Sequence, residues 1–354
     1  MERRIPVAIL GATGAVGQRF VQLLEGHPWF RVAALSGSER TEGRPYAEAC
    51  RWVLDGDMPE AVRELVLQPT TAEALGCRLA FSALPASVAG PLEEDLARAG
   101  VAVCSNASSH RQDSDVPLLI AEINPDHLAL VAVQRRRRGW PGLIVTGPNC
   151  TSVPVTVVLR ALERAFGVRH AHVVSLQALS GAGYPGVASL DILDNVVPFI
   201  AEEEAKLETE PLKMLGHLKG ETIRPAPLAI SAQCNRVQVR DGHLVCMSIA
   251  LGRRVRPREV AEALAGYQGE LAGLDLPSAP HPLIVVRAEP DRPQPRRDRD
   301  AGGGMAISVG RIQPCPVNDV RLVALSHNTV RGAAGGVILD AELLVARGLV
   351  EAPR

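Results

Sequence analysis

The chain has 354 residues, a length that favours two domains over a single hydrophobic core. With 46% hydrophobic and 22% charged residues its composition is typical of a soluble globular protein, and no apolar stretch approaches the ~20 residues that a membrane span needs. A net charge of −1 provides no long-range field for nucleic acid or anionic lipid, so we expect neither a nucleic-acid nor a membrane partner.

The seven cysteines form no Cys-x-x-Cys pair and are scattered along the chain. Such an odd set argues against a disulfide framework and against a zinc site, and it fits a reducing compartment. No signal-peptide core precedes the first predicted strand, so we expect a cytoplasmic protein without a bound metal. The run Arg135–Arg138 is short and has no interleaved aromatic residues, and we interpret it as a solvated surface loop.

The first chemically informative segment is rich in glycine. Residues 6–10 form a short apolar run, Gly11–Gly17 follow at once, and an amphipathic helical pattern then begins. In this strand, turn and helix context, the glycines allow a sharp turn and let a pyrophosphate approach the helix N-terminus. The sequence therefore predicts a dinucleotide site with contacts from Gly11, Thr13, Gly14, Ala15 and Val16.

The second predicted strand, residues 31–35, bears on the choice of cofactor. NAD sites usually place Asp or Glu at the end of this strand, roughly 20 residues past the glycines, for the ribose hydroxyls. Here the strand is followed by small hydroxyls and an arginine, namely Ser36, Ser38, Arg40 and Thr41. This arrangement suits a 2′-phosphate and favours NADP, while Glu39 leaves NAD open.

Strand and helix patterns continue to alternate, which predicts a parallel, doubly wound sheet of the Rossmann type. The predicted elements are strands over 79–83, 101–104 and 143–146 and a helix over 92–99. The turns after the strands carry Ser82, Asn106, Ser108 and the pair Asn149-Cys150. Because such sheets bind ligands at the carboxyl ends of their strands, we expect the thiol to lie beside the cofactor.

Cys150 directly precedes a helix predicted over 151–167. Apolar residues recur there at helical spacing, and Pro154 falls in the first turn, where proline is tolerated. A thiol at a helix N-terminus faces unpaired N–H groups and the positive end of the helix dipole, and both favour the nucleophilic thiolate. A buried structural cysteine is the alternative interpretation.

After this helix the pattern changes to strands, which predicts a second, α+β domain with a mixed, largely antiparallel sheet. The predicted strands span residues 171–179, 228–231, 233–240, 244–251 and 283–288. A charged, helical stretch over 191–218 interrupts them, and residues 328–347 look helical after their start. We expect domains over 1–149 and 150–327, with residues 328–354 packing back on the first.

Asp241-Gly242 indicates a tight turn that exposes His243 at the start of the next strand. A histidine close to a cysteine can serve as a general base and can stabilise a thiolate.

Taken together, these motifs resemble those of aspartate-semialdehyde dehydrogenases, specifically the branch found in archaea, fungi and some bacteria. The resemblance runs nearly from end to end. It covers residues 11–17, 38–43, 147–151, 176–186, 235–243, 292–300 and 328–335.

The resemblance implies an NADP-binding domain, a catalytic and dimerisation domain, and covalent hydride chemistry. Cys150 would attack the acyl phosphate of 4-phospho-L-aspartate, expel inorganic phosphate and form a thioester that NADPH reduces, while His243 acts as acid and base. Gln177 would orient the acyl group and Arg236 would bind the substrate carboxylate. Further substrate contacts would come from Arg111, Lys213, Glu210 and Asn149, and further cofactor contacts from Ser82, Ser180, Gly181, Gly183 and Asn328. Pro211 interrupts the expected helix beside Lys213. The resemblance also implies a homodimer or homotetramer.

Two other reductases remain open on sequence, and two other classes of protein fit the motifs less well. Malonyl-CoA reductase shares this scaffold and its cysteine, and Arg236 does not discriminate because both substrates end in a carboxylate. Cations at Arg111 and Lys213 favour the acyl phosphate, and N-acetyl-glutamyl-phosphate reductase is a more distant option. A Cys/His hydrolase has no use for a dinucleotide cradle, and a non-catalytic NADP sensor has no need of both Cys150 and His243.

Overall fold

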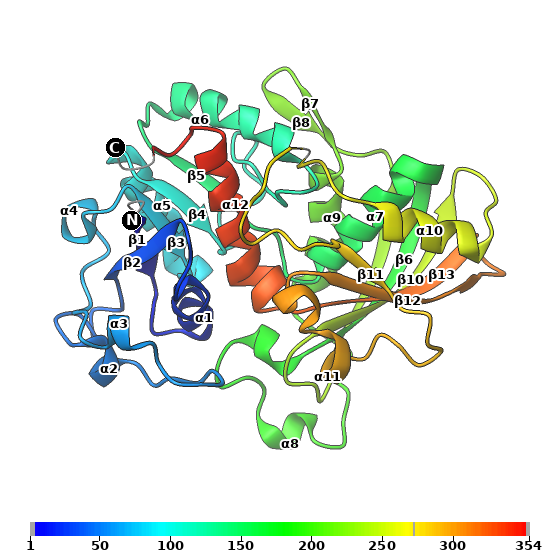
Figure 1. The fold of residues 1–354 in the computed structure, drawn as a ribbon, viewed down its shortest axis with the longest axis horizontal. Coiled ribbons are helices and arrows are strands. Elements are labelled where there is room, and N and C mark those ends of the chain that lie inside the picture. The colour runs from blue at the N-terminus through cyan, green and yellow to red at the C-terminus, as the bar shows by residue number, and fades with distance from the viewer. Residues whose placement is uncertain (1–3, 272, 352–354) are drawn as a thin grey trace.

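The computed structural model describes residues 4–271 and 273–351, which form two large sheets with helices packed against them and one small hairpin (Figure 1). The first sheet is entirely parallel, in the order β2-β1-β3-β4-β5. Its strands are β1 Ile5–Leu10, β2 Phe30–Leu35, β3 Leu79–Ser82, β4 Ala102–Ser105 and β5 Leu143–Thr146. Every residue of β3, β4 and β5 is buried, as expected of strands covered on both faces. The Rossmann-type prediction is confirmed.

Helices connect these strands. They are α1 Ala15–Leu24, α2 Tyr46–Ala49, α3 Glu60–Arg63, α4 Ala72–Leu75, α5 Ala86–Arg98 and α6 Leu130–Arg138, which follows the 3-10 turn η1 Pro125–Ala129. The prediction of a solvated loop at Arg135–Arg138 was wrong, because these residues form the last turn of α6. Three of these charges are paired: Arg138 contacts Asp113 and Asp115, and Arg136 and Arg137 contact Glu221, while Arg135 Nε donates to the Gly142 carbonyl.

The second sheet is mixed, in the order β11-β12-β13-β10-β6-β9. Its strands are β6 Val168–Gln177, β9 Ala229–Arg236, β10 His243–Leu251, β11 Ile284–Val286, β12 Ile307–Pro314 and β13 Val320–Ser326. Two pairs, β6 with β9 and β11 with β12, are parallel, and the other pairs are antiparallel. The sequence prediction missed β12 and β13, and it divided into two strands what is the single strand β9.

Helices cover one face of this sheet. They are α7 Ser152–Phe166, α9 Glu203–Met214 and α10 Pro257–Gly266, and their apolar side chains share a core with the inward residues of the strands. The opposite face is open in the described chain, where His172, Val174, Gln233 and Cys246 are exposed. Of the stretch predicted to be helical over 191–218, only α9 and the end of α8 Ser189–Ile192 are helical. It ends in a small hairpin of β7 His217–Lys219 and β8 Thr222–Arg224.

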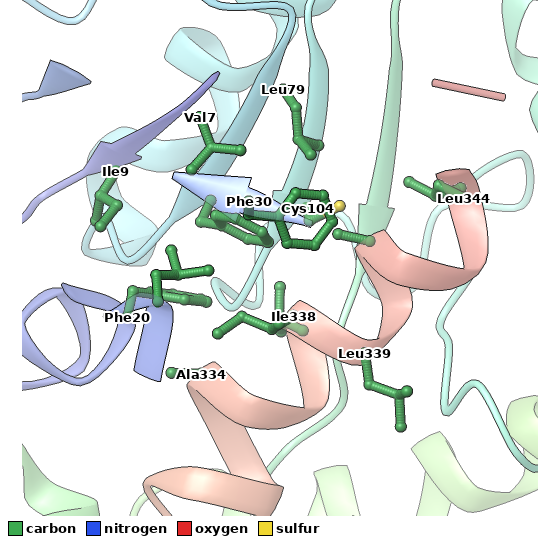
Figure 2. Close-up of a cluster of buried hydrophobic side chains, with 14 of the residues drawn as sticks. Val7, Ile9, Phe20, Phe30, Leu79, Cys104, Ala334, Ile338, Leu339 and Leu344 are labelled. Carbon is green, nitrogen blue, oxygen red and sulfur yellow. The ribbon is translucent and has the colours of Figure 1, made fainter. Parts of the chain in front are cut away.

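The C-terminal helix α12, Gly335–Ala346, returns to the first sheet (red in Figure 1). Its residues Ile338 and Leu344 lie in one core cluster with Val7, Phe20 and Phe30 of β1, α1 and β2 (Figure 2). Full burial of such a side chain contributes about 1.5–3 kcal/mol. This packing anchors the segment just before α12, which includes the π-helical turn η4 Val330–Ala334, between the two sheets. Among the described residues, no helix is long and apolar enough to cross a membrane.

Candidate active site

The structure brings Cys150 and His243 into contact. Cys150 lies between β5 and α7, His243 is the first residue of β10, and the distance from His243 Nε2 to Cys150 Sγ is 3.1 Å. The expectation that a tight turn exposes His243 was wrong, because the residue is completely buried. The strand β10 lies inside the sheet between β13 and β6, so β9 and β10 form no hairpin and His243 faces the interior.

A backbone hydrogen bond fixes how His243 presents its proton. The Ala178 N–H donates to His243 Nδ1 over 3.0 Å, so Nδ1 is an acceptor and the neutral ring carries its hydrogen on Nε2. That hydrogen points at the sulfur. Burial, together with the positive charge of Arg236 and the nearby His327, lowers the pKa of His243 to about 3. The ring is therefore a neutral hydrogen-bond donor toward Cys150 at neutral pH.

The structure does not favour the predicted thiolate. Asn149 Oδ1 accepts from the N–H groups of Thr151 (2.8 Å) and Ser152 (3.3 Å), so the N–H group at the start of α7 and the one before it are bonded to an amide oxygen and not to sulfur. Burial and the Glu203 carboxylate raise the pKa of Cys150 to about 12, although Arg111 and Arg236 act in the opposite direction. The resting site is therefore a thiol beside a neutral imidazole.

Arg236 and Gln177 close the site on the side of the second sheet. They are the last residues of the neighbouring strands β9 and β6 and are directly paired in the register. Arg236 Nη1 donates to the Ala178 carbonyl over 2.8 Å, which fixes the guanidinium. Gly181 leaves room for both functional groups, because a Cβ there would lie 2.9 Å from Arg236 Nη1 and from His243 Cε1.

Arg111 enters the site from the loop after β4. Its Nη1 donates to Glu210 Oε1 over 3.0 Å and its Nη2 to the Asn106 carbonyl over 2.9 Å, while its buried Nε has no partner among the described residues. Glu210 in turn accepts from the backbone N–H of Asn149 over 2.6 Å. One carboxylate therefore links Arg111 to the residue that precedes Cys150.

Lys213 lies against the loop that carries Arg111. Its ammonium donates to the carbonyls of Arg111 (2.7 Å), Asp113 (2.8 Å) and Val116 (3.0 Å), and these bonds use all three of its hydrogens. Burial lowers its pKa to about 8. Pro211 lies inside α9 and does not end it, so Glu210 and Lys213 remain on one helix.

The cofactor residues predicted in the first domain gather at the carboxyl edge of its sheet. Gly11 has φ +69°, and a Cβ there would lie 2.9 Å from the Ala83 carbonyl, so the turn requires glycine. Thr13 to Val16 continue into α1. Ser36 is buried and accepts a hydrogen bond from Thr70 Oγ1 (2.9 Å), whereas Ser38 and Arg40 are exposed and Thr41 Oγ1 donates to the Ser38 carbonyl (2.9 Å).

A cleft of about 290 Å³ joins the two halves. Ala15 and Arg19 of α1 line it on one side, and Ser180, Gly183 and Thr329 line it on the other. Asn328 fixes this second side, since its Oδ1 accepts from the Gly242 N–H (2.8 Å) and its Nδ2 donates to Ser180 Oγ (2.8 Å). Of the predicted cofactor residues, Ala15 of the first half and Ser180 and Gly183 of the second therefore border one space.

Sequence reasoning missed several groups at the site. Glu203 accepts hydrogen bonds from Asn149 and Gln177, Arg331 forms a buried ion pair with Glu122, and Arg240 pairs with Asp55 across the cleft. Glu203 lies in an acidic run, Glu202–Glu204, in which no local signal distinguishes one carboxylate from the next. No cluster of three or more His, Cys, Asp or Glu side chains suited to a metal ion occurs within residues 4–271 and 273–351.

Comparison with known proteins gives matches along nearly the whole chain. The family model described as "Semialdehyde dehydrogenase, NAD binding domain" matches residues 6–131, and that described as "Semialdehyde dehydrogenase, dimerisation domain" matches residues 159–331. The aspartate-semialdehyde dehydrogenase of Archaeoglobus fulgidus is 48% identical, with 98% of this chain and 100% of that protein covered.

Fungal relatives give the same result. The aspartate-semialdehyde dehydrogenase of Saccharomyces cerevisiae is 40% identical, with 97% of this chain and 98% of that protein covered. The crystal structure of the Candida albicans aspartate-semialdehyde dehydrogenase with NADP superposes with a TM-score of 0.90 at 41% identity, with 98% of this chain and 100% of that chain covered. The chain belongs to the aspartate-semialdehyde dehydrogenase family.

Proposed function

We propose that the chain catalyses the NADPH-dependent reductive dephosphorylation of 4-phospho-L-aspartate to L-aspartate 4-semialdehyde. The observation that carries this proposal is the 3.1 Å contact between His243 Nε2 and the Cys150 thiol, in a site that also holds Arg236 and Arg111. A nucleophilic sulfur next to two guanidinium groups suits a substrate with a carboxylate at one end and an acyl phosphate at the other. The product would serve the biosynthesis of lysine, threonine, methionine and isoleucine.

The residues at the carboxyl edge of the first sheet fit a dinucleotide. A side chain at Gly17 would overlap the Gly11 carbonyl, so the glycine turn stays open and close to the N-terminus of α1. Ser82 is buried at the carboxyl end of β3, beside the Glu93 carboxylate. The hydroxyls of Ser38 and Thr41 and the guanidinium of Arg40 suit a 2′-phosphate, and the C. albicans relative was crystallised with NADP. When bound, NADPH supplies the hydride that reduces the thioester carbon.

Cys150 supplies the covalent chemistry in this proposal. Its sulfur bonds to the acyl carbon, the bond from that carbon to the phosphate oxygen breaks, and inorganic phosphate leaves with the electron pair and takes up the thiol proton. Once that carbon is reduced, its oxygen carries a negative charge; the oxygen re-forms the carbonyl as the carbon–sulfur bond breaks, the sulfur leaves with the electron pair, and the aldehyde is released. His243 Nε2–H faces the sulfur in both steps and stabilises negative charge on it. The ring can accept the thiol proton only if Nδ1 takes up a hydrogen and releases the Ala178 N–H.

The remaining groups bind and orient the substrate. Arg236 would hold the α-carboxylate with its planar fork, and Gln177, its partner in the register, would orient the acyl group. Arg111 would bind the departing phosphate, which its unpartnered Nε supports. Lys213 would contribute through the loop it holds, because its three hydrogens are already bonded to carbonyls.

We also propose that the chain forms a homodimer or homotetramer. The open face of the second sheet, with exposed Val174 and Cys246, supports this assembly, as does the match of residues 159–331 to a dimerisation domain.

The direct test measures NADP⁺ reduction with L-aspartate 4-semialdehyde in the presence and absence of inorganic phosphate. Cys150→Ala is expected to abolish turnover, because no other group in contact with His243 can form the thioester, while NADP binding stays within about twofold of the parent. Binding can be followed by the fluorescence of NADPH. Retained turnover in this variant would overturn the assignment of the nucleophile.

A further inference from the structure

Glu203 lies in the centre of the site, although no local sequence pattern distinguishes it from the acidic residues beside it. It is the first residue of α9 and is 9% exposed. One carboxylate oxygen accepts from Asn149 Nδ2 over 2.8 Å, and the other accepts from Gln177 Nε2 over 3.0 Å. Asn149 directly precedes Cys150 in the chain, and Gln177 ends the strand next to Arg236. A single side chain therefore joins the two amides that flank the nucleophile.

A carboxylate can only accept hydrogen bonds, and this property fixes both amides in one orientation. Each amide must turn its NH₂ group toward Glu203, so each amide oxygen points away from it. For Asn149 the consequence is visible, because its Oδ1 is then directed to the N–H groups of Thr151 and Ser152 at the start of α7. Glu203 thereby fixes the Asn149 amide that bonds the backbone directly after Cys150.

The charge of Glu203 also acts on the sulfur. Four ionisable groups from different elements face Cys150: His243 of β10, Arg236 of β9, Arg111 of the loop after β4, and Glu203 of α9. The two arginines favour a negative sulfur, His243 is neutral, and Glu203 opposes the charge. Lys206 Nζ, 3.7 Å from a Glu203 oxygen, offsets part of this effect, and Glu210 is already paired with Arg111.

We propose that Glu203 is a positioning residue, whose carboxylate orients the Asn149 and Gln177 amides around Cys150. This inference rests on the proposed function only for its effect on turnover. Its effect on the thiol belongs to the free protein and needs no substrate.

The test compares three variants of the full chain. Glu203→Gln removes the charge and replaces one acceptor oxygen by a donor, so it can no longer accept from both amides. Glu203→Asp keeps the charge but is one methylene shorter. Glu204→Gln is the matched control, because Glu204 is the next residue on α9, is exposed, and accepts from the Cys234 N–H at the edge of the sheet.

The first readout is the rate at which neutral iodoacetamide alkylates Cys150 at pH 8, followed by mass spectrometry of the peptide that contains it. This peptide assay separates Cys150 from the exposed Cys246. Glu203→Gln is expected to react about three- to tenfold faster than the parent, since loss of a nearby negative charge raises the thiolate fraction by about tenfold while lowering its intrinsic nucleophilicity. Glu203→Asp and Glu204→Gln are expected to stay within about twofold of the parent.

The second readout is kcat in the phosphate-dependent assay. Both Glu203 variants are expected to lose about tenfold or more, because at least one flanking amide is released, and Glu204→Gln is expected to retain the parental kcat. An unchanged or slower alkylation of Glu203→Gln would overturn the proposal, and so would parental kcat in Glu203→Asp. If Glu203→Gln does not fold, the kcat of Glu203→Asp alone decides. Faster alkylation in Glu203→Gln with no dehydrogenase activity in the parent would refute the proposed function and leave the effect of Glu203 on the thiol standing.

Discussion

The buried ion pair between Arg331 and Glu122 provides the strongest prediction about stability. Arg331 Nη1 and Nη2 donate to the two oxygens of Glu122 over 2.8 and 2.9 Å, and the side chains are 1% and 3% exposed. The pair ties η4, which packs against Cys150 through Gly332, to the segment before η1. Replacing Arg331 by Met keeps a flexible apolar stem of similar length and removes the charge.

The expected loss follows from what remains behind. Glu122 would be a buried carboxylate without a counter-charge, and removal of one partner from a buried pair costs about 3–5 kcal/mol. The nearby Asp340 cannot replace the lost positive charge, because it is itself an acid. Burial and the Glu122 charge already raise its pKa well above the ordinary value. Replacing both partners by Met in Arg331→Met/Glu122→Met removes the stranded charge, and such apolar replacement is often neutral or stabilising.

Urea unfolding without added cofactor tests this prediction, because bound ligand would mask part of the loss. Far-UV circular dichroism and tryptophan fluorescence should be recorded together to check for a single transition, as a chain with two sheets need not unfold in one step. We expect the single variant to lose about 3–5 kcal/mol and the double variant to recover most of that loss. The claim that an unpaired Glu122 carboxylate causes the loss would be refuted by either of two results. One is a free energy of unfolding of the single variant within about 1 kcal/mol of the parent, and the other is a double variant no more stable than the single one.

Three further predictions concern the site. Gly181→Ala should lower kcat/KM by at least about tenfold with little change in melting temperature, because the added Cβ at this exposed position would lie 2.9 Å from atoms of Arg236 and His243. Parental kinetics in this variant would show that the two side chains move apart freely. Arg236→Lys should raise KM strongly in steady-state assays, since a point charge cannot replace a planar fork, and an unchanged KM would exclude the carboxylate role. The third prediction concerns pH: His243 has a pKa of about 3 when folded and near 6.5 when unfolded, so the unfolded chain binds more protons and stability falls as pH drops below about 6.5. At pH 5 this histidine accounts for about 2 kcal/mol of that loss, which should disappear from the pH dependence of urea unfolding in His243→Gln; an identical dependence in parent and variant would contradict it.

Local sequence patterns were sufficient for the first sheet and for the position of the nucleophile. The glycine turn after β1 and the apolar run of β5 encode their own conformation, and Cys150 follows β5 at the edge where such sheets bind ligands. Alternation in the second half also identified β6 and β10. The roles of Gln177 and Arg236 were expected only from the family resemblance, and their pairing at the ends of β6 and β9 was not predicted, because the register of distant strands leaves no local signal.

The predictions that failed depended on tertiary surroundings. The thiolate at Cys150 was predicted from the helix N-terminus alone, but the Asn149 amide oxygen accepts from the N–H groups of Thr151 and Ser152, and Glu203 comes from a segment more than 50 residues away in the chain. Exposure of His243 was predicted from an Asp-Gly turn, whereas β10 is covered on both edges by strands, one of which was not foreseen. The arginines of α6 were assigned to a solvated loop because the run is short and has no interleaved aromatic residues, and their acidic partners, such as Asp113 and Glu221, lie too far away in sequence to be foreseen.

The most direct test of the proposed activity is NADPH formation from L-aspartate 4-semialdehyde and NADP⁺, measured at 340 nm with and without inorganic phosphate, beside an assay of malonyl-CoA reduction. We expect NADPH formation that requires phosphate, because phosphate must cleave the thioester on Cys150 to give the acyl phosphate. NADPH oxidation with malonyl-CoA, and no phosphate-dependent reaction with the semialdehyde, would contradict the acyl-phosphate assignment while leaving the thiol chemistry in place.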